Sequence, residues 1–564
     1  MRPLKPLPIG HSFFERIIEG GYYYVDKTLF IKDILDKGAT VTLCTRPRRF
    51  GKTLNQTMLK CFFEDTAKTD NKNTHALFNG LKIEQFGERY LGHQGKYPVI
   101  FLSFKESKLP DFDGSYDMLT YEISGEFRRH EYVKEKIFDK TELGLFEKIA
   151  THSASLKDYS KSLRLLSKCL EKYYGEKAIV LIDEYDVPLE NSWSSGFYQE
   201  MASFIRPLLS GALKDNPHLQ FAVITGCLRI SKESVFTGLN NLDIMSVLSS
   251  YYSEYFGFTQ AEINALLGYY DLENNAETIK RWYDGYLFGK TEVYNPWSVI
   301  NCVSDWRIDS EYVPRPYWVN TSANDIVRKL INKADDETRA NLEVLMAGQT
   351  IQKVIYEDIT YDEVDNNVNN LWSFMFFTGY LKKTGESRLD ENDAQWLDLS
   401  IPNIELKYIY TSKIQEWFRE KIELKDFSKF YEAILNGNAK EAQEELGKFL
   451  LETISYMDGR EDFYHGIMLG ILSGIRNYYV NSNRESGLGR CDIIMKHSSG
   501  RGKAIIFELK CTSNMHEIEK KSQEALEQID DNMYGKELEV ECYSDIIKYG
   551  IAFCKKSCEI RKAL

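Results

Sequence analysis

Nine residues near the N-terminus have the composition of a loop that binds phosphate groups. The stretch Thr45–Thr53 reads TRPRRFGKT, and it stands between an apolar run, Thr40–Cys44, and a helical pattern. A loop that leads from a strand into a helix N-terminus points backbone amides at an anion, and the helix dipole also favours the negative charge. In such a loop, Lys52 would reach the β- and γ-phosphates, and the Thr53 hydroxyl would hold Mg²⁺.

An acidic pair at the end of a second apolar run fits the same chemistry. The run Ala178–Ile182 is followed directly by Asp183 and Glu184. Asp183 would hold Mg²⁺ through water or through Thr53, and Glu184 would polarise the attacking water. The alternative is a strand that ends in an ordinary acidic turn, and the GKT string upstream argues against it. The loop itself departs from GxxxxGK[ST] at Arg46, which stands where the first glycine belongs.

Further candidates for phosphate contacts lie near these residues. A third predicted strand is Phe221–Thr225. In P-loop ATPases with a catalytic glutamate, which these residues resemble, a strand usually lies between the loop strand and the acidic strand. In that place Thr225, at the end of the third strand, would sense the γ-phosphate. Arg229 would sense the charge at the site or act as an arginine finger. The alternative is a turn in which the arginine is solvated. Arg48 and Arg49 would flank the phosphates or bind a neighbouring acidic surface, and a solvated position on an exposed loop is again the alternative.

Two apolar stretches near the C-terminus predict a β-hairpin. Residues 490–496 and 503–509 flank a Ser-Ser-Gly-Arg-Gly turn, which is a hairpin signal. In a hairpin centred near Gly500, Asp492 lies across from Glu508. Side chains alternate along a strand, so Lys510, two positions after Glu508, shares its face.

Asp492, Glu508 and Lys510 together suit the hydrolysis of a phosphodiester. The two carboxylates are hard oxygen ligands for Mg²⁺ or Mn²⁺, and the metal lowers the pKa of a bound water while Lys510 positions the nucleophile or steadies developing charge. The alternative is a cross-strand salt bridge on a solvated face. The apolar surroundings of Glu508 argue against that alternative. Three other polar residues are weaker candidates for this site: Glu461, Glu485 and Gln528.

Composition narrows the class of protein. The chain has 564 residues, which predicts three or four domains at roughly 150 residues each. Hydrophobic residues make up 43% and charged residues 27%, as in ordinary soluble proteins. The net charge of −13 disfavours general binding of polyanions, so any contact with nucleic acid must be a local basic patch or a site bridged by metal.

Cysteine spacing and hydropathy predict a location. The ten cysteines form no CxxC pair, which argues against a zinc ribbon, and several lie in apolar runs. Residues 1–20 contain no apolar core of a signal peptide, and no stretch approaches 18 apolar residues. We expect a reduced, cytoplasmic protein without a membrane partner.

The predicted elements divide the chain into three regions. Apolar runs of the buried-strand type alternate with helical patterns as far as about Tyr255, which predicts a parallel sheet covered on both faces. These runs are 40–44, 99–104, 178–182 and 219–224. A helix-rich stretch follows, and strands return near the C-terminus. We predict an α/β domain at 1–255, a helical middle region at 256–455 and a smaller α/β domain at 456–564.

Several segments carry a resemblance to known families. Those that look like the bacterial AAA-ATPase-like family are YYYVDKT (22–28), TRPRRFGKT (45–53), WYDGY (282–286) and YNPWS (294–298). Asp492 with Glu508-Leu509-Lys510 resembles the PD-(D/E)XK nuclease superfamily. The family's loop is similar to TRPRRFGKT, which makes Arg46 a family trait.

The resemblance implies a P-loop NTPase sheet, a helical middle region and a C-terminal α/β PD-(D/E)XK nuclease-like domain. It implies ATP with Mg²⁺ as cofactors, and Mg²⁺ or Mn²⁺ at the nuclease site. The residues implied are Gly51, Lys52, Thr53, Asp183 and Glu184 for the nucleotide, and Asp492, Glu508 and Lys510 for metal binding and hydrolysis. For Trp282, Tyr286 and Trp297 we expect core or interdomain packing, and for Asp26 a helix cap.

The leading hypothesis is an ATPase coupled to a metal-dependent nuclease, with DNA favoured over RNA as its partner. A rival hypothesis is a signalling ATPase whose nuclease-like domain binds without cutting. A scaffold with two degenerate sites is a third, and the intact Lys52, Glu184 and Asp492 argue against it. The oligomeric state is open, and a homo-oligomer is one possibility. Assembly into a ring would need an arginine supplied in trans.

Overall fold

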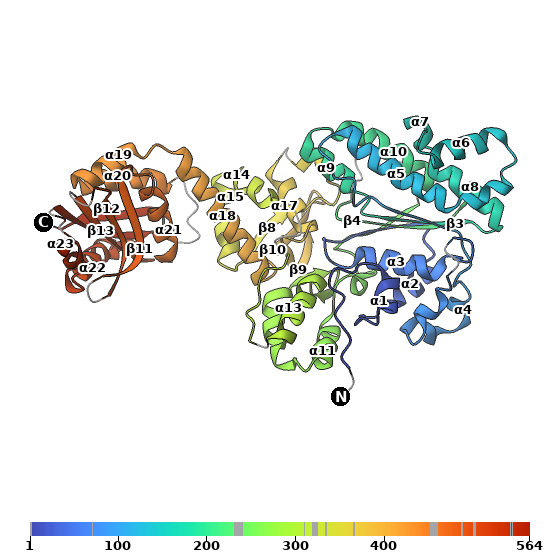
Figure 1. Cartoon of the computed structure of the whole chain (residues 1–564), viewed down its shortest axis with the longest axis horizontal. Helices are drawn as coiled ribbons and strands as arrows, with labels where there is room; N and C mark the ends of the chain where they lie inside the picture. The colour runs from blue at the N-terminus through green and yellow to red at the C-terminus, as the bar shows by residue number, and fades with distance from the viewer. Residues whose placement is uncertain are drawn as a thin grey trace. The chain divides into compact units, whose positions relative to one another are not determined.

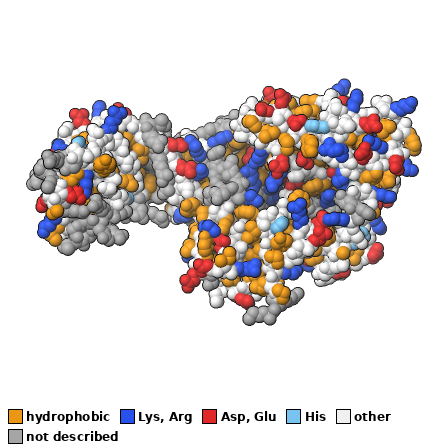
Figure 2. Space-filling view, viewed as in Figure 1, with side chains coloured by type: hydrophobic (Ala, Val, Ile, Leu, Met, Phe, Trp, Pro, Cys, Tyr) orange, Lys and Arg blue, Asp and Glu red, His pale blue; other side chains and the backbone are white. Residues whose placement is uncertain are grey.

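The computed structural model of the chain (Figure 1) is described here as two units. The described residues are 3–69, 72–229, 241–309, 311–318, 325–332, 335–364, 367–451, 461–486, 489–499, 503–541, 543 and 545–563. Unit 1 comprises 1–326 and 350–409, and unit 2 comprises 327–349 and 410–564. Among the described helices, none combines the length and the apolar character needed to span a bilayer. Figure 2 shows acidic and basic side chains interspersed over the visible surface.

A parallel sheet forms the centre of unit 1. Its described strands are β1 (Val41–Thr45), β2 (Val99–Ser103), β3 (Ala178–Asp183), β4 (Leu219–Gly226) and β5 (Leu242–Met245). They lie in the order β2-β3-β4-β1-β5, and every neighbouring pair is parallel. The four runs predicted from the sequence are β1 to β4. The order also confirms that β4 lies between the loop strand and the acidic strand.

Helices cover both faces of this sheet, as its unbroken apolar strands require. Figure 1 shows α1, α2 and α3 on one side and α5, α8, α9 and α10 on the other. The bounds are α1 (Phe14–Glu19), α2 (Leu29–Lys37), α3 (Lys52–Phe63), α4 (Glu88–Leu91), α5 (Phe112–Arg129), α6 (Lys140–Ala150), α7 (Leu156–Tyr159), α8 (Ser162–Tyr174), α9 (Val187–Ser195) and α10 (Tyr198–Leu213).

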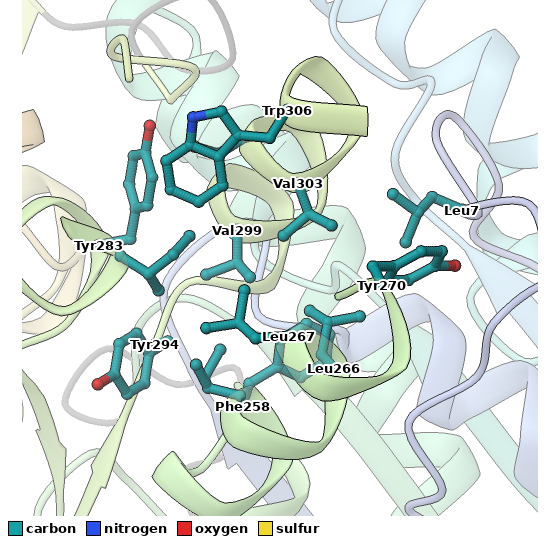
Figure 3. Packing of buried hydrophobic residues seen from close by; sticks show 13 residues of the cluster. Leu7, Phe258, Leu266, Leu267, Tyr270, Tyr283, Tyr294, Val299, Val303 and Trp306 are labelled. Carbon is teal, nitrogen blue, oxygen red and sulfur yellow. The ribbon is translucent and has the colours of Figure 1, made fainter. Parts of the chain in front are cut away.

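Three helices and a small hairpin follow the sheet. They are α11 (Gln260–Tyr269), α12 (Ala276–Tyr283), α13 (Pro296–Ile308), β6 (Tyr286–Phe288) and β7 (Thr291–Val293). The apolar faces of the three helices meet in one buried cluster, which Figure 3 shows in part. Leu7 from the N-terminal segment joins this cluster beside Tyr270, so the start of the chain is anchored to the helices.

The remainder of unit 1 holds a second sheet. Strands β8 (Ile351–Val354), β9 (Lys382–Leu389) and β10 (Gln395–Ser400) lie antiparallel in the order β8-β10-β9. Beside them stand α16 (Tyr361–Val364) and α17 (Val368–Phe377), and α18 (Ile404–Leu424) begins in unit 1 and continues in unit 2. The middle region is therefore mainly helical, as predicted, with two small sheets that the sequence did not predict.

Unit 2 contains a mixed sheet. Its described strands β11 (Tyr478–Ser486), β12 (Gly489–His497), β13 (Lys503–Cys511), β14 (Asp545–Cys554) and β15 (Ser557–Lys562) lie in chain order, and β13 and β14 are parallel. The described helices are α14 (Asp325–Asn332), α15 (Asp336–Met346), α19 (Ser428–Asn436), α20 (Ala439–Leu451), α21 (Glu461–Leu472), α22 (Ile518–Asp531) and α23 (Gly535–Val540). Ile493 pairs with Phe507, which is the register predicted for a hairpin centred near Gly500, itself outside the described residues.

Candidate active sites

The phosphate loop of unit 1 turns sharply into α3. Gly51 precedes the helix with a φ of 84°, in the left-handed region that glycine adopts without strain. Lys52 follows as the first helical residue and is 3% exposed. Its Nζ donates to the backbone oxygens of Arg46 (3.1 Å) and Pro47 (3.2 Å) and lies 3.5 Å from Glu184 Oε1. The ammonium group is therefore held inside the curve of the loop.

Asp183 lies at the centre of the site, where three strands end side by side. The Thr53 hydroxyl donates to Asp183 Oδ2 (2.6 Å), and the Thr225 hydroxyl donates to Oδ1 (2.7 Å). Both contacts depend on the order β3-β4-β1, which brings the end of each strand to one edge. Burial, and next the charge of Glu184, raise the pKa of Asp183 above its usual range.

Glu184 has an unusual backbone conformation and an unsatisfied oxygen. Its φ is 53°, which costs a non-glycine residue roughly 1–2 kcal/mol. Its Oε2 is buried and accepts a hydrogen bond from no residue that the structure describes. A buried carboxylate oxygen without a donor is costly, so a water or substrate group would be bound favourably there.

Asp186 is a site residue that the sequence analysis does not single out. It is buried, and its Oδ2 accepts hydrogen bonds from the backbone amides of Cys227 (2.7 Å) and Leu228 (2.9 Å). These bonds join the segment after β3 to the segment after β4. The available signal is the string Asp-Glu-Tyr-Asp, in which a third acid follows the acidic pair.

Arg46 points away from the phosphate site. The side chain is fully buried, and its Nη1 donates to the backbone oxygens of Thr45 (2.8 Å) and Met245 (2.6 Å). The guanidinium carbon lies 5.2 Å and 5.1 Å from the ring centroids of Phe256 and Phe288. Burial lowers the pKa of Arg46 to about 10. Arg46 thus ties the loop to β5 and to an aromatic cage, which explains why the position is not a glycine.

The other two arginines of the loop have partners. Arg48 forms an ion pair with Glu190 on α9, and Arg49 lies over the ring of Trp297, 4.3 Å from its centroid. Arg229, after β4, pairs with Asp358 (2.9 Å). The solvated alternative is therefore wrong for Arg48, which binds an acidic neighbour.

A cavity of about 360 Å³ opens beside the loop. Its lining includes Arg48, Arg49, Gly51, Lys52, Thr53 and Glu184. Trp297 also lines it and is only half-buried, so this residue is not part of the core. Tyr286 is buried and Trp282 packs against the cluster of α11 to α13, as expected.

Asp26 does not cap a helix directly. The N-cap residue of α2 is Thr28, and its amide and hydroxyl donate to Asp26 Oδ1 (2.9 and 2.6 Å). Asp26 Oδ2 accepts from the amide of Lys82 (2.7 Å). The predicted cap is therefore a turn that joins the start of α2 to a distant segment.

A buried carboxylate connects the motif YNPWS and Trp318 to the start of α18. Glu405 accepts hydrogen bonds from the Ser298 hydroxyl (2.9 Å to each oxygen) and the Trp318 amide (2.9 Å). Burial raises the pKa of Glu405 to about 7. Ser298 belongs to the motif YNPWS and follows Trp297, so this contact fixes the helix turn that borders the cavity.

The predicted nuclease residues come together in unit 2. The Leu509 amide donates to Asp492 Oδ2 (2.8 Å), and the Asp492 amide lies 3.4 Å from Glu508 Oε2. Lys510 Nζ lies 3.8 Å from Glu508 Oε1, and Gln528 on α22 donates to the same carboxylate. Glu508 is 1% exposed, which excludes a solvated salt bridge.

His465 on α21 is a second residue that the sequence did not indicate. Its Nε2 lies 2.9 Å from the backbone oxygen of Asp492 and 3.1 Å from the Ser482 hydroxyl. The side chains of Glu461 and Glu485 lie outside the described residues. Within the described part of the chain, no group of three or more metal-ligating side chains occurs.

Both sites have donors that suit a divalent hard cation. At the phosphate loop, a hydroxyl and a carboxylate meet at 2.6 Å, and the unsatisfied Glu184 oxygen lies in the adjacent acidic segment. In unit 2, the donors are the carboxylates of Asp492 and Glu508. Oxygen ligands of this kind fit Mg²⁺ or Mn²⁺ better than a soft metal.

Comparison with known families agrees with this architecture. Residues 8–236 match the model of a family described as predicted AAA-ATPase, and residues 459–563 match the PD-(D/E)XK nuclease superfamily. The chain combines an AAA-ATPase-like domain with a domain of the PD-(D/E)XK nuclease superfamily. It is also similar to a protein from Azotobacter chroococcum mcd 1 described as an uncharacterized protein in the vnfD 5′ region. The two are 28% identical over 405 residues, which cover 72% of this chain and 68% of the relative.

The buried position of Arg46 predicts a loss of stability in Arg46→Gly, although a glycine would restore the common loop pattern. Removal of the cation leaves carbonyls without donors and an empty aromatic cage, at a cost of about 2–4 kcal/mol. Thermal unfolding of the full-length protein would measure the loss. Arg128→Ala is the matched control, because Arg128 contacts a carbonyl and a ring at an exposed position. A variant as stable as the wild type would contradict this role.

Glu405 predicts a pH-dependent stability. Because its pKa is raised, the folded protein keeps a proton that the unfolded chain releases, so stability falls as pH rises towards about 7. Glu405→Gln mimics the protonated acid, and we expect it to be about 1–3 kcal/mol more stable than the wild type at pH 8 and equal to it at pH 4, below the pKa of the unfolded side chain. Urea unfolding at both pH values would measure this, with the exposed Glu416→Gln on the same helix as control. Equal stability at pH 8 would contradict the prediction.

Proposed function

We propose that the protein is an ATPase coupled to a metal-dependent nuclease that acts on DNA. The observation that supports this most is the convergence of Lys52, Thr53, Asp183, Glu184 and Thr225 beside one cavity edge. These residues come from the loop, α3 and the ends of two further strands. Neither a salt bridge nor a helix cap requires that combination.

In the proposed ATPase reaction, Lys52 binds the β- and γ-phosphates from the position in which the loop carbonyls already hold it. Thr53 and Asp183 hold Mg²⁺, which when bound neutralises phosphate charge. Glu184 orients the attacking water and accepts its proton, because its unsatisfied oxygen is an acceptor inside a low-dielectric site. Thr225 holds Asp183 in place and lies at the γ-phosphate end of its strand.

In the proposed nuclease reaction, Asp492 and Glu508 hold the metal, which when bound polarises the phosphate. Lys510 positions the attacking water and steadies the charge that develops on the phosphate. The Leu509 amide and Gln528 orient the two carboxylates through the hydrogen bonds they donate. His465 keeps the strand that carries Asp492 in position through its backbone contact.

A second candidate function is a signalling ATPase whose C-terminal domain binds nucleic acid without cutting it. One observation favours it, the net charge of −13. It shares the ATPase half of the leading proposal. The two differ in what Asp492 does.

Two substitutions test the ATPase. We expect Lys52→Ala to weaken ATP binding at least about tenfold, because a charged contact with phosphate is lost. We expect Glu184→Gln to bind ATP normally and to hydrolyse it at least about 100-fold more slowly, because the proton acceptor is gone. Calorimetry and phosphate release would measure the two effects. Glu200→Gln, at an exposed position on α10, should leave both unchanged. Full activity in Glu184→Gln would remove it from the mechanism.

The nuclease is tested by cleavage of plasmid and single-stranded DNA with Mg²⁺ or Mn²⁺, with and without ATP. We expect Asp492→Ala and Lys510→Ala to abolish cutting and Lys52→Ala to change its dependence on ATP. Asp531→Ala, on the exposed face of α22, is the control. Cutting that survives in Asp492→Ala would point to a contaminant. A wild type that hydrolyses ATP but cuts neither DNA nor RNA would support the signalling function.

A further inference from the structure

The cavity beside the phosphate loop continues past the loop into an apolar region. The loop and Glu184 form only one part of its lining. The remaining lining comes mainly from the N-terminal segment, the Tyr23–Val25 stretch and the helices after the sheet, with Lys105 and Lys108 after β2 and Val187 on α9. The side chains on which the argument depends are Ile9, Val25, Phe258, Leu266, Trp297 and Ile300.

This apolar wall is firmly anchored. Phe258 and Leu266 belong both to the lining and to the buried cluster of α11 to α13 shown in Figure 3. Leu7 is inserted in the same cluster, and the Tyr23 amide donates to the Pro6 oxygen (2.9 Å). Residues 8–12 therefore pass along the cavity as a strap that is held at its start by the cluster. The phenol of Tyr270 adds a bond to the Lys5 oxygen (2.8 Å).

Two polar side chains of this region, Lys27 and Asn55, already have partners. Lys27 pairs with Glu262 (2.6 Å), and Asn55 donates to the backbone oxygen of Tyr255 (2.9 Å). These groups are committed within the fold. The exposed Lys105 and Lys108 also line the cavity, while its surface is apolar and aromatic along residues 8–12 and α11 to α13. A flat, weakly polar ring would suit that part of the surface.

Trp297 connects the apolar wall to the loop. Asn295 caps α13 by accepting from the Trp297 amide (3.0 Å), and the indole Nε1 donates to the Tyr317 oxygen (3.3 Å). The ring is thus fixed in orientation, with Arg49 of the loop stacked 4.3 Å from its centroid. An aromatic ring held beside a phosphate-binding loop has the placement needed to contact the base of a nucleotide.

We propose that the apolar part of this cavity binds the base and ribose of the nucleotide whose phosphates the loop binds. Trp297 and Ile300 form one side of this nucleoside site, and Ile9 on the strap forms another. The inference rests on the proposed ATPase function. The volume of about 360 Å³ is within the range of small-molecule pockets. In this nucleoside site the motif YNPWS has a role in ligand binding that its sequence alone did not indicate.

The test compares ATP with inorganic tripolyphosphate, which has the phosphates and no nucleoside. Binding of both to the full-length protein would be measured by calorimetry with Mg²⁺. We expect Trp297→Ala to weaken the binding of ATP about fivefold or more, since a base–aromatic contact contributes an energy of that size. The affinity for tripolyphosphate should change by less than about twofold. Trp297→Phe should keep most of the ATP affinity.

Ile9→Asp provides an independent variant. Ile9 is 39% exposed, so the substitution is compatible with folding, and it places a carboxylate beside the proposed base. We expect Ile9→Asp also to weaken the binding of ATP and to leave the binding of tripolyphosphate unchanged. Trp282→Ala is the matched control, because Trp282 packs against the same helical cluster and does not line the cavity.

The outcomes separate the two proposals. A wild type that binds neither ligand would overturn the phosphate site and, with it, the ATPase. Loss of both ligands to the same degree in Trp297→Ala would show that the ring acts through Arg49 alone and would overturn the nucleoside site. ATP binding unaffected in both Trp297→Ala and Ile9→Asp would overturn the nucleoside site and leave the phosphate site standing.

Discussion

The two hydroxyl groups bonded to Asp183 are the contact on which the geometry of unit 1 depends. Thr53 reaches the carboxylate from the first turn of α3 and Thr225 from the end of β4. In the observed order β4 lies between β1 and β3, and the ends of all three strands meet at one edge. A strand order that placed β1 farther from β3 would move the loop away from the acidic segment by about 4.8 Å for each position. The carboxylate is buried with neutral donors, which keeps it available for a cation.

Arg46 stands where the common loop pattern has a glycine, and most of its partners come from distant parts of the fold. A buried guanidinium is costly unless its donors are used and its charge is compensated. Arg46 donates to carbonyls of β1 and the end of β5, and two aromatic rings face its charge. The side chain therefore stabilises the base of the loop, while the amides of the loop remain available for phosphate. The same device connects the loop to the small hairpin β6–β7, which carries Phe288.

The aromatic motifs of the middle region acquire a physical role through their neighbours. Tyr283 and Tyr294 belong to the buried cluster, Ser298 holds the buried Glu405, and Trp297 faces Arg49. One helix, α13, thus has a face in the cluster, a contact with the start of α18 and a side chain at the cavity. Rigid packing on one face is what allows the other to present a fixed ring to a ligand.

Much of this protein could be predicted from local sequence. The strands β1 to β4, the GKT turn, the pair Asp183-Glu184 and the register of β12 with β13 all follow from patterns within a few residues, because apolar runs and turn residues act over short distances. The partners of Arg46, Arg48 and Trp297, the role of Asp186 and the contacts of His465 with β11 and β12 could not be predicted in that way. Arg46 and Met245 are 199 positions apart, and Arg48 and Glu190 are 142 apart. Such contacts are decided by packing of whole elements, which no local pattern encodes, and the tertiary structure alone places the ring of Trp297 at the cavity.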